Sequence, residues 1–79
     1  MLTSAEIRAT TFSATRWREG YDKAEVDAFL ARIALAIDTR TAIAPLEIVN
    51  ARFRPTKFRE GYDQDQVDNL LDRLVESLR

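Results

Sequence analysis

Two segments of the chain each place one aromatic residue between two cations. These six residues are Arg16, Trp17 and Arg18 in one segment and Lys57, Phe58 and Arg59 in the other. An aromatic ring can enter the headgroup region of a membrane, while each neighbouring cation gains about 1 kcal/mol near anionic lipid. We therefore expect these residues to contact a membrane or a protein partner. The alternative is that both rings pack into the core and the cations are solvated.

The remaining polar residues do not form a catalytic pattern. Asp22, Glu25 and Asp63 have the positions of helix caps, not of a carboxylate pair. The sequence contains no phosphate-binding glycine loop, no metal-ligand cluster and no nucleophile–base set, and it has neither Cys nor His. These features predict a non-enzymatic protein that needs no cofactor, metal or disulfide.

Length and charge narrow the class of protein further. The 79 residues fit a single domain, 1–79, and the net charge of −1 is not that of a nucleic-acid-binding domain. No apolar run approaches the roughly 18 residues of a membrane span, and the first residues do not resemble a secretion signal. We expect a cytoplasmic protein, either free or peripheral on the cell membrane.

The chain contains one motif twice. Residues 2–37 align with 43–78 at a constant offset of 41 without a gap, and 13 of the 36 pairs are identical. Such self-similarity predicts the same supersecondary unit made twice. The identical pairs at Asp27/Asp68 and Arg32/Arg73 are expected on solvated helix faces or in pairs across the helices. The repeated loop residues expected to have a structural role are Gly20, Tyr21, Asp22, Gly61, Tyr62 and Asp63, and both glycines are expected at positive φ.

Each copy is predicted to form a short helix, a loop and a longer helix. Caps and apolar spacing predict helices at 4–10, 23–38, 45–51 and 64–78, with each long helix starting in a reciprocal cap between its cap aspartate and Glu25 or Gln66. A 4-3-4 spacing predicts a coiled-coil-like seam between the long helices, made by Val26, Leu30, Ile33, Ile37, Val67, Leu71, Leu74 and Leu78. The expected fold is all-α: two tandem helix-loop-helix repeats in a pseudo-symmetric pair.

Both copies resemble a known bacterial segment. The first copy has Leu2 to Ile7, Phe12, Trp17 to Asp22, Glu25 to Asp27 and Phe29-Leu30, and the second runs from Ile43 to Leu78. This pattern is similar to the N-terminal membrane-targeting segment of the DivIVA family. The resemblance implies a parallel pair of helices whose loops cross at the tip, with an exposed aromatic that touches the membrane. At that position this sequence has Trp17 and Phe58.

The resemblance also bears on assembly. Family members usually continue into a long coiled coil, which does not follow the second copy here. We therefore expect one chain to supply both halves of the pair, as a monomeric pseudo-dimer. A homo-oligomer, or a longer coiled-coil protein of which this sequence is a part, remains an alternative.

The expected function is that of a DivIVA-like adaptor or scaffold at the inner face of the bacterial cell membrane, in cell division or polarity, with an unidentified protein partner. One alternative is a soluble protein-protein interaction module that does not bind lipid. A weaker alternative is a small DNA-associated regulator, indicated by the basic stretch 52–59 but opposed by the net charge.

Overall fold

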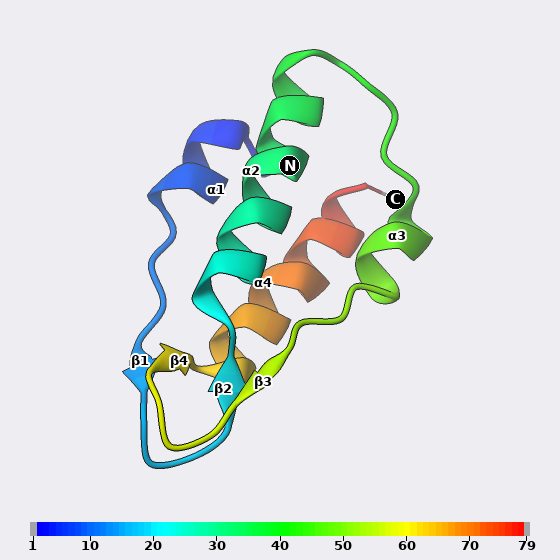
Figure 1. The fold of residues 1–79 in the computed structure, drawn as a ribbon. Helices are drawn as coiled ribbons and strands as arrows, with labels where there is room; N and C mark the ends of the chain where they lie inside the picture. Colours follow the sequence, from blue (N-terminus) through cyan, green and yellow to red (C-terminus); the bar gives the residue numbers. More distant parts are fainter. Residues whose placement is uncertain (1, 79) are drawn as a thin grey trace.

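The computed structural model describes residues 2–78, and within that range it contains four helices and four two-residue strands (Figure 1). The first repeat contains α1 (Ser4–Ala9), β1 (Ala14–Thr15), β2 (Gly20–Tyr21) and α2 (Lys23–Asp38). The second repeat contains α3 (Pro45–Val49), β3 (Pro55–Thr56), β4 (Gly61–Tyr62) and α4 (Gln64–Ser77). Both long helices start at the end of the molecule where the strands lie (Figure 1). In residues 2–78 no helix has both the length and the apolar content needed to cross a bilayer.

The four helices lie within one or two residues of their predicted bounds, because local signals define their ends. The side chain of Asp22 accepts the N–H of Glu25 at 3.1 Å and begins α2. Asp63 accepts the N–H of Gln66 at the same distance and begins α4. Pro45 occupies the first turn of α3, where its missing N–H leaves no helical bond unmade.

The prediction of an all-α fold is wrong, because the loop segments form a four-stranded antiparallel sheet in the order β1-β4-β2-β3. Every pairing joins one repeat to the other: β1 with β4, β2 with β3 and β2 with β4. A strand is recognised in sequence by alternation over about four to eight residues. Strands of two residues are too short to show it, and their partners lie far away in the chain.

Only the aspartate half of each expected reciprocal cap forms, and the other half is replaced by a contact between the repeats. The side chain of Glu25 does not turn back to its own cap but accepts the backbone N–H of Arg54 at 2.6 Å. Gln66 accepts the N–H of Ser13 at 2.7 Å in the equivalent contact. The first turn of each long helix therefore holds the strand segment of the opposite repeat.

The apolar stripes of the long helices face a common core. Six of the eight seam residues are buried and two, Ile37 and Leu78, are partly buried. Ile7 of α1 and Ile48 of α3 are buried in the same cluster. The backbones of the long helices approach each other less closely than each approaches its own short helix. The predicted seam is therefore one part of a four-helix core, not a separate two-helix coiled coil.

Two tyrosine–aspartate hydrogen bonds fasten the repeats beside the sheet. The hydroxyl of Tyr21 donates to Asp68 at 2.8 Å, and the hydroxyl of Tyr62 donates to Asp27 at 2.7 Å. Burial, followed by the bond to Asp68, raises the pKa of Tyr21 to about 12. The bond to Asp27, followed by burial, raises the pKa of Tyr62 to about 12. Both aspartates hold the opposite repeat in place.

We predict a loss of stability in strong alkali that comes from these two tyrosines. An unfolded tyrosine titrates near pH 10, so a raised folded pKa gives a stabilising contribution that is complete below about pH 10 and is lost as the pH rises toward about 12. The measurement is the free energy of unfolding in denaturant across that range. Ultraviolet absorbance should show tyrosinate forming near pH 12 in the folded chain.

The control is the double variant Tyr21→Phe with Tyr62→Phe, which removes both tyrosines of the chain. It should be less stable at neutral pH, by about 1 kcal/mol for each lost bond, and should lack this alkaline loss. Two tyrosines that titrate near pH 10 in the folded parent would contradict the prediction.

Candidate interaction site at the crossed loops

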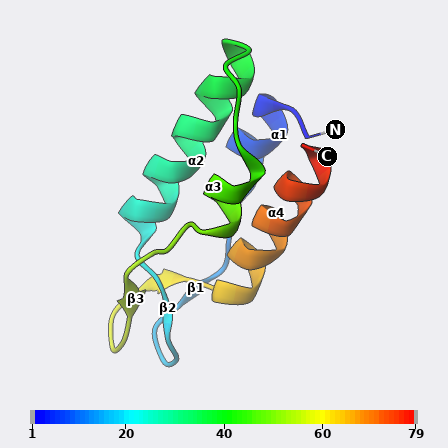
Figure 2. The same cartoon turned by 90° about the vertical axis from the view of Figure 1, so that its right-hand side faces the viewer.

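Trp17 and Phe58 lie in the two loops that link the strands of each repeat. These loops, β1–β2 and β3–β4, project side by side from one end of the molecule (Figures 1 and 2). The side chains are strongly exposed, Trp17 at 91% and Phe58 at 82%. Neither ring is part of the core, so the alternative that both pack inside the protein does not hold.

The backbone of Phe58 has a left-handed conformation, with φ 64°. For a residue with a bulky side chain this region costs roughly 1–2 kcal/mol relative to ordinary backbone. Trp17, at the equivalent position, is not among the described residues with positive φ. Because the ring of Phe58 is exposed, its packing does not offset this cost. A glycine or asparagine would suit the fold better there, so the phenylalanine indicates a role outside folding.

Two of the cations beside the rings form ion pairs across the repeats. Arg18 pairs with Asp63, and Arg59 pairs with Asp22 at 3.2 Å. The pKa of Asp22 is lowered, first by the backbone N–H of Glu25 that it caps and then by Arg59. Both arginines therefore help to hold the two repeats together where the β1–β2 and β3–β4 loops meet, a region that we call the crossing. The charge of both arginines is largely matched by carboxylates.

The other two cations are less closely engaged. Arg16 lies 3.9 Å from Glu60, whose pKa is lowered first by Lys23. Lys57 lies 5.7 Å from the centre of the Phe58 ring and belongs to no ion pair within residues 2–78. Residues 13–22 and 54–63 together carry five cations and four carboxylates, a net charge of +1. This end of the molecule therefore presents two exposed aromatic rings on a surface that is only weakly basic.

The expectation that both glycines adopt positive φ is wrong, since neither does. They are needed because backbones approach closely at the crossing. A Cβ on Gly61 would lie 2.1 Å from Thr56 Oγ1 and 2.8 Å from the carbonyl oxygen of Tyr21, and a Cβ on Gly20 would lie 2.7 Å from that of Tyr62. Any larger side chain would separate the central strands.

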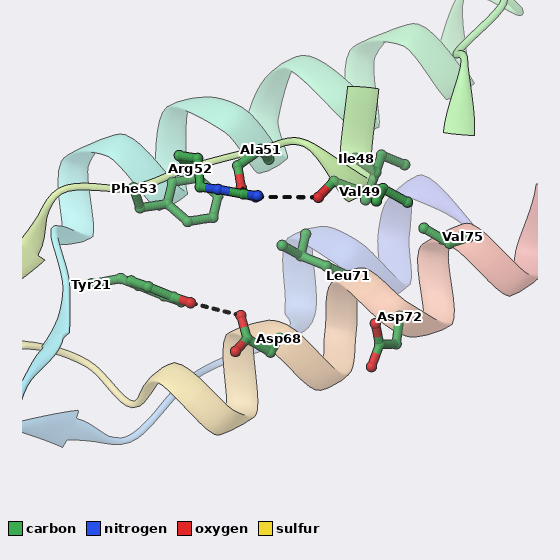
Figure 3. Close-up of a pocket in the computed structure, with 10 residues that line it drawn as sticks. All are labelled: Tyr21, Ile48, Val49, Ala51, Arg52, Phe53, Asp68, Leu71, Asp72 and Val75. Atoms are coloured by element: carbon green, nitrogen blue, oxygen red, sulfur yellow. Dashed lines mark hydrogen bonds between the residues drawn. The ribbon is translucent and has the colours of Figure 1, made fainter. Parts of the chain in front are cut away.

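A cavity of about 480 Å³ lies between α3 and α4 (Figure 3). Tyr21 and Asp68, joined by their hydrogen bond, line one end of it, and Arg52, another lining residue, donates to the carbonyl of Val49 (Figure 3). A smaller equivalent of about 190 Å³ in the first repeat is lined by the Tyr62–Asp27 pair. These polar groups fasten the fold, and we place no site there. Among residues 2–78 no group of His, Cys, Asp or Glu side chains could hold a metal ion.

The six predicted contact residues, 16–18 and 57–59, lie in the two loops at one end of the molecule. The six predicted loop residues, 20–22 and 61–63, follow them in the chain and lie in or next to the sheet. Asp27 and Asp68 lie on exposed helix faces, as expected, but sequence reasoning missed that each accepts a hydrogen bond from a tyrosine of the opposite repeat. A signal for this role was present in the sequence, because both copies have aspartate at that position, three residues before a buried leucine. The missing information was that a tyrosine of the opposite repeat lies opposite each one.

Comparison of the chain with models of protein families, with curated proteins and with solved structures found no match. The geometry of the crossed loops and the sequence resemblance of the repeats are therefore the two grounds for assigning a function.

We predict that Gly61→Ala destabilises the chain by about 1–3 kcal/mol, the usual cost of forcing atoms into a packed site. The free energy of unfolding in denaturant measures it. Gly20→Ala should cost a similar amount, because its closest contact, at 2.7 Å, is with the backbone carbonyl of Tyr62, which cannot rotate away as a side chain can.

Thr56→Ala provides the matched control for Gly61→Ala. Thr56 Oγ1 is buried without a hydrogen-bond partner among the described residues, so loss of the hydroxyl costs little, and the variant alone should lose only about 1 kcal/mol for the buried methyl group. In the double variant it should recover part of the loss at Gly61. A double variant in which the two losses simply add would show that close approach is not the reason for the glycine.

We predict that Phe58→Asn leaves the free energy of unfolding unchanged or raises it by up to about 1 kcal/mol, because asparagine tolerates the left-handed region. Thermal and denaturant unfolding measure the effect. Trp17→Asn is the matched control, and it should bring no gain because Trp17 lacks positive φ. A clear loss of stability in Phe58→Asn would mean that the ring supports the fold.

Proposed function

We propose that this chain is a non-enzymatic DivIVA-like adaptor that attaches peripherally to the inner face of a bacterial cell membrane and serves cell division or polarity. Trp17 and Phe58 are the residues that enter the membrane. One observation carries the proposal: two strongly exposed aromatic rings, one from each repeat, lie in loops that project from the same end of the molecule.

The two loops project in the same direction, which supports binding to a flat surface such as a membrane. β2 and β4 are paired, each leads directly into a long helix, and both α2 and α4 run away from the end where the strands lie (Figures 1 and 2). Both loops therefore face one surface. Once the first ring has entered a bilayer, the second is held close to it, which raises its effective concentration at the same surface.

The charge of the tip gives only modest attraction. A cation near anionic lipid contributes about 1 kcal/mol, but Arg18 and Arg59 are already paired with aspartates. Lys57, and to a smaller extent Arg16, which lies 3.9 Å from Glu60, supply the electrostatic attraction that remains. A single chain is expected to bind weakly, mainly through the two rings, and firm attachment requires several copies at one site.

A second candidate function is recognition of a protein partner by the same tip, without lipid. The ion pairs of Arg18 and Arg59 favour it, since matched charges attract anionic lipid poorly. Exposed tryptophan is also frequent at the energetic centres of protein interfaces. A role in DNA binding has less support, because Arg54 lies 3.9 Å from Glu25 and Arg59 is paired.

Vesicle co-sedimentation tests the membrane proposal. The parent should sediment with vesicles that contain anionic lipid, and the double variant Trp17→Ser with Phe58→Ser should lose at least about tenfold in affinity, equivalent to about 1.4 kcal/mol. Trp17 is the only tryptophan of the chain, so a blue shift of its emission reports its entry into the bilayer.

The matched control is the double variant Leu46→Ser with Val49→Ser, which removes two exposed apolar side chains from α3, away from the loops (Figure 1). It should bind vesicles as the parent does. Equal binding by the tip variant and the parent would refute the insertion mechanism. A parent that binds no vesicle of any composition but captures a protein that the tip variant fails to capture would support the second candidate.

A further inference from the structure

The surface that joins the two repeats contains most of the specific contacts of the fold. All three strand pairings cross from one repeat to the other, and so do both tyrosine–aspartate bonds and both arginine–aspartate pairs. The covalent connection between the repeats, by contrast, is only the segment 39–44. The repeats therefore hold each other through contacts that do not involve this connection.

These contacts are the same in both directions. Tyr21 of the first repeat binds Asp68 of the second as Tyr62 of the second binds Asp27 of the first. None of these tyrosine–aspartate or arginine–aspartate contacts involves a residue of the segment 39–44. Nothing in the contacts distinguishes a partner repeat on the same chain from one on another copy.

The connecting segment 39–44, the linker, contains Arg40, which with Phe58 is one of the two left-handed residues within 2–78. Helix α2 ends in a Schellman turn, with the N–H of Thr41 bound to Ala36 O at 2.8 Å and that of Arg40 bound to Ile37 O at 3.2 Å. Arg40 has φ 56° at the position that glycine usually occupies. The closed chain therefore holds an unfavourable backbone at the point where it turns back from α2 toward α3 (Figure 1).

We propose that this chain also pairs with a second copy of itself by exchange, so that the first repeat of each copy packs on the second repeat of the other. The exchange dimer keeps every contact between repeats and releases the turn at Arg40. This inference does not depend on membrane binding.

Concentration decides between the two forms. A short linker holds the second repeat at an effective concentration of about 1 mM, so the closed monomer is favoured in dilute solution. The balance shifts to the dimer when the linker cannot span the gap or when the protein itself becomes concentrated. Exchange of an identical element is a common, low-cost route to such dimers.

A shortened linker tests the proposal in the full chain. Deleting residues 41–43 removes about 10 Å of reach, since an extended residue spans about 3.3–3.6 Å. The variant should have twice the monomer mass by light scattering at about 10 µM, far below the effective concentration of a short linker. The tyrosine pKa values should remain raised as in the parent, because the exchanged repeats rebuild both tyrosine–aspartate bonds.

The deletion also removes Ile43, which packs against the core. Ile43→Ala with a linker of full length is therefore the matched control, and it should stay monomeric. A deletion variant that is monomeric, whether folded or unfolded, would overturn the proposal. So would a dimer whose tyrosines titrate near pH 10, because its repeats would not be paired in this way.

The parent chain provides a second test that needs no variant. Refolded at about 1 mM and then diluted, it should keep a dimer fraction that converts to monomer only on unfolding, whereas refolding at about 1 µM should yield monomer alone. A parent that shows the same monomer mass after both treatments would equally overturn the proposal.

Discussion

Strand pairing between the repeats is the interaction on which the rest of this structure depends. Neither repeat can make a sheet alone, because each two-residue strand finds its partner in the other copy. Strands this short are not stable without support. The support comes from the first turns of the long helices, where Glu25 and Gln66 hold the opposite backbone. Helix starts, strands and core thus form one cooperative unit.

The same crossing determines which side chains of the β1–β2 and β3–β4 loops are exposed to a partner. Gly20 and Gly61 allow the central strands to approach closely, and the arginines beside the rings are drawn into ion pairs beneath them. The rings of Trp17 and Phe58 lie in the loops beyond the strands and remain exposed to solvent. A rigid base with two exposed aromatic residues suits reversible attachment to a surface, and the left-handed backbone at Phe58 indicates that this arrangement has a cost in stability.

The two copies differ most where they do not touch each other. The five residues from Arg18 to Asp22 recur unchanged at 59–63, in the segment that forms the crossing. The short helices differ: α3 exposes Leu46 and Val49, where α1 has Ala5 and Arg8. The cavity beside α3 is also the larger of the two. The residues that the two copies share are therefore concentrated where the repeats contact each other, and for this reason the contacts are equivalent in both directions.

The sequence by itself determined the internal repeat, the four helices, the caps at Asp22 and Asp63 and the apolar stripes, because these follow from residues within a few positions of each other. Only the tertiary structure decided the sheet, the true role of the glycines, the targets of Glu25 and Gln66 and the exposure of Trp17 and Phe58. Each of these depends on which segment of the other repeat lies opposite. Local sequence patterns do not contain that information, since the contacts of Glu25 and Gln66 join residues 29 and 53 positions apart and form only when both copies fold together.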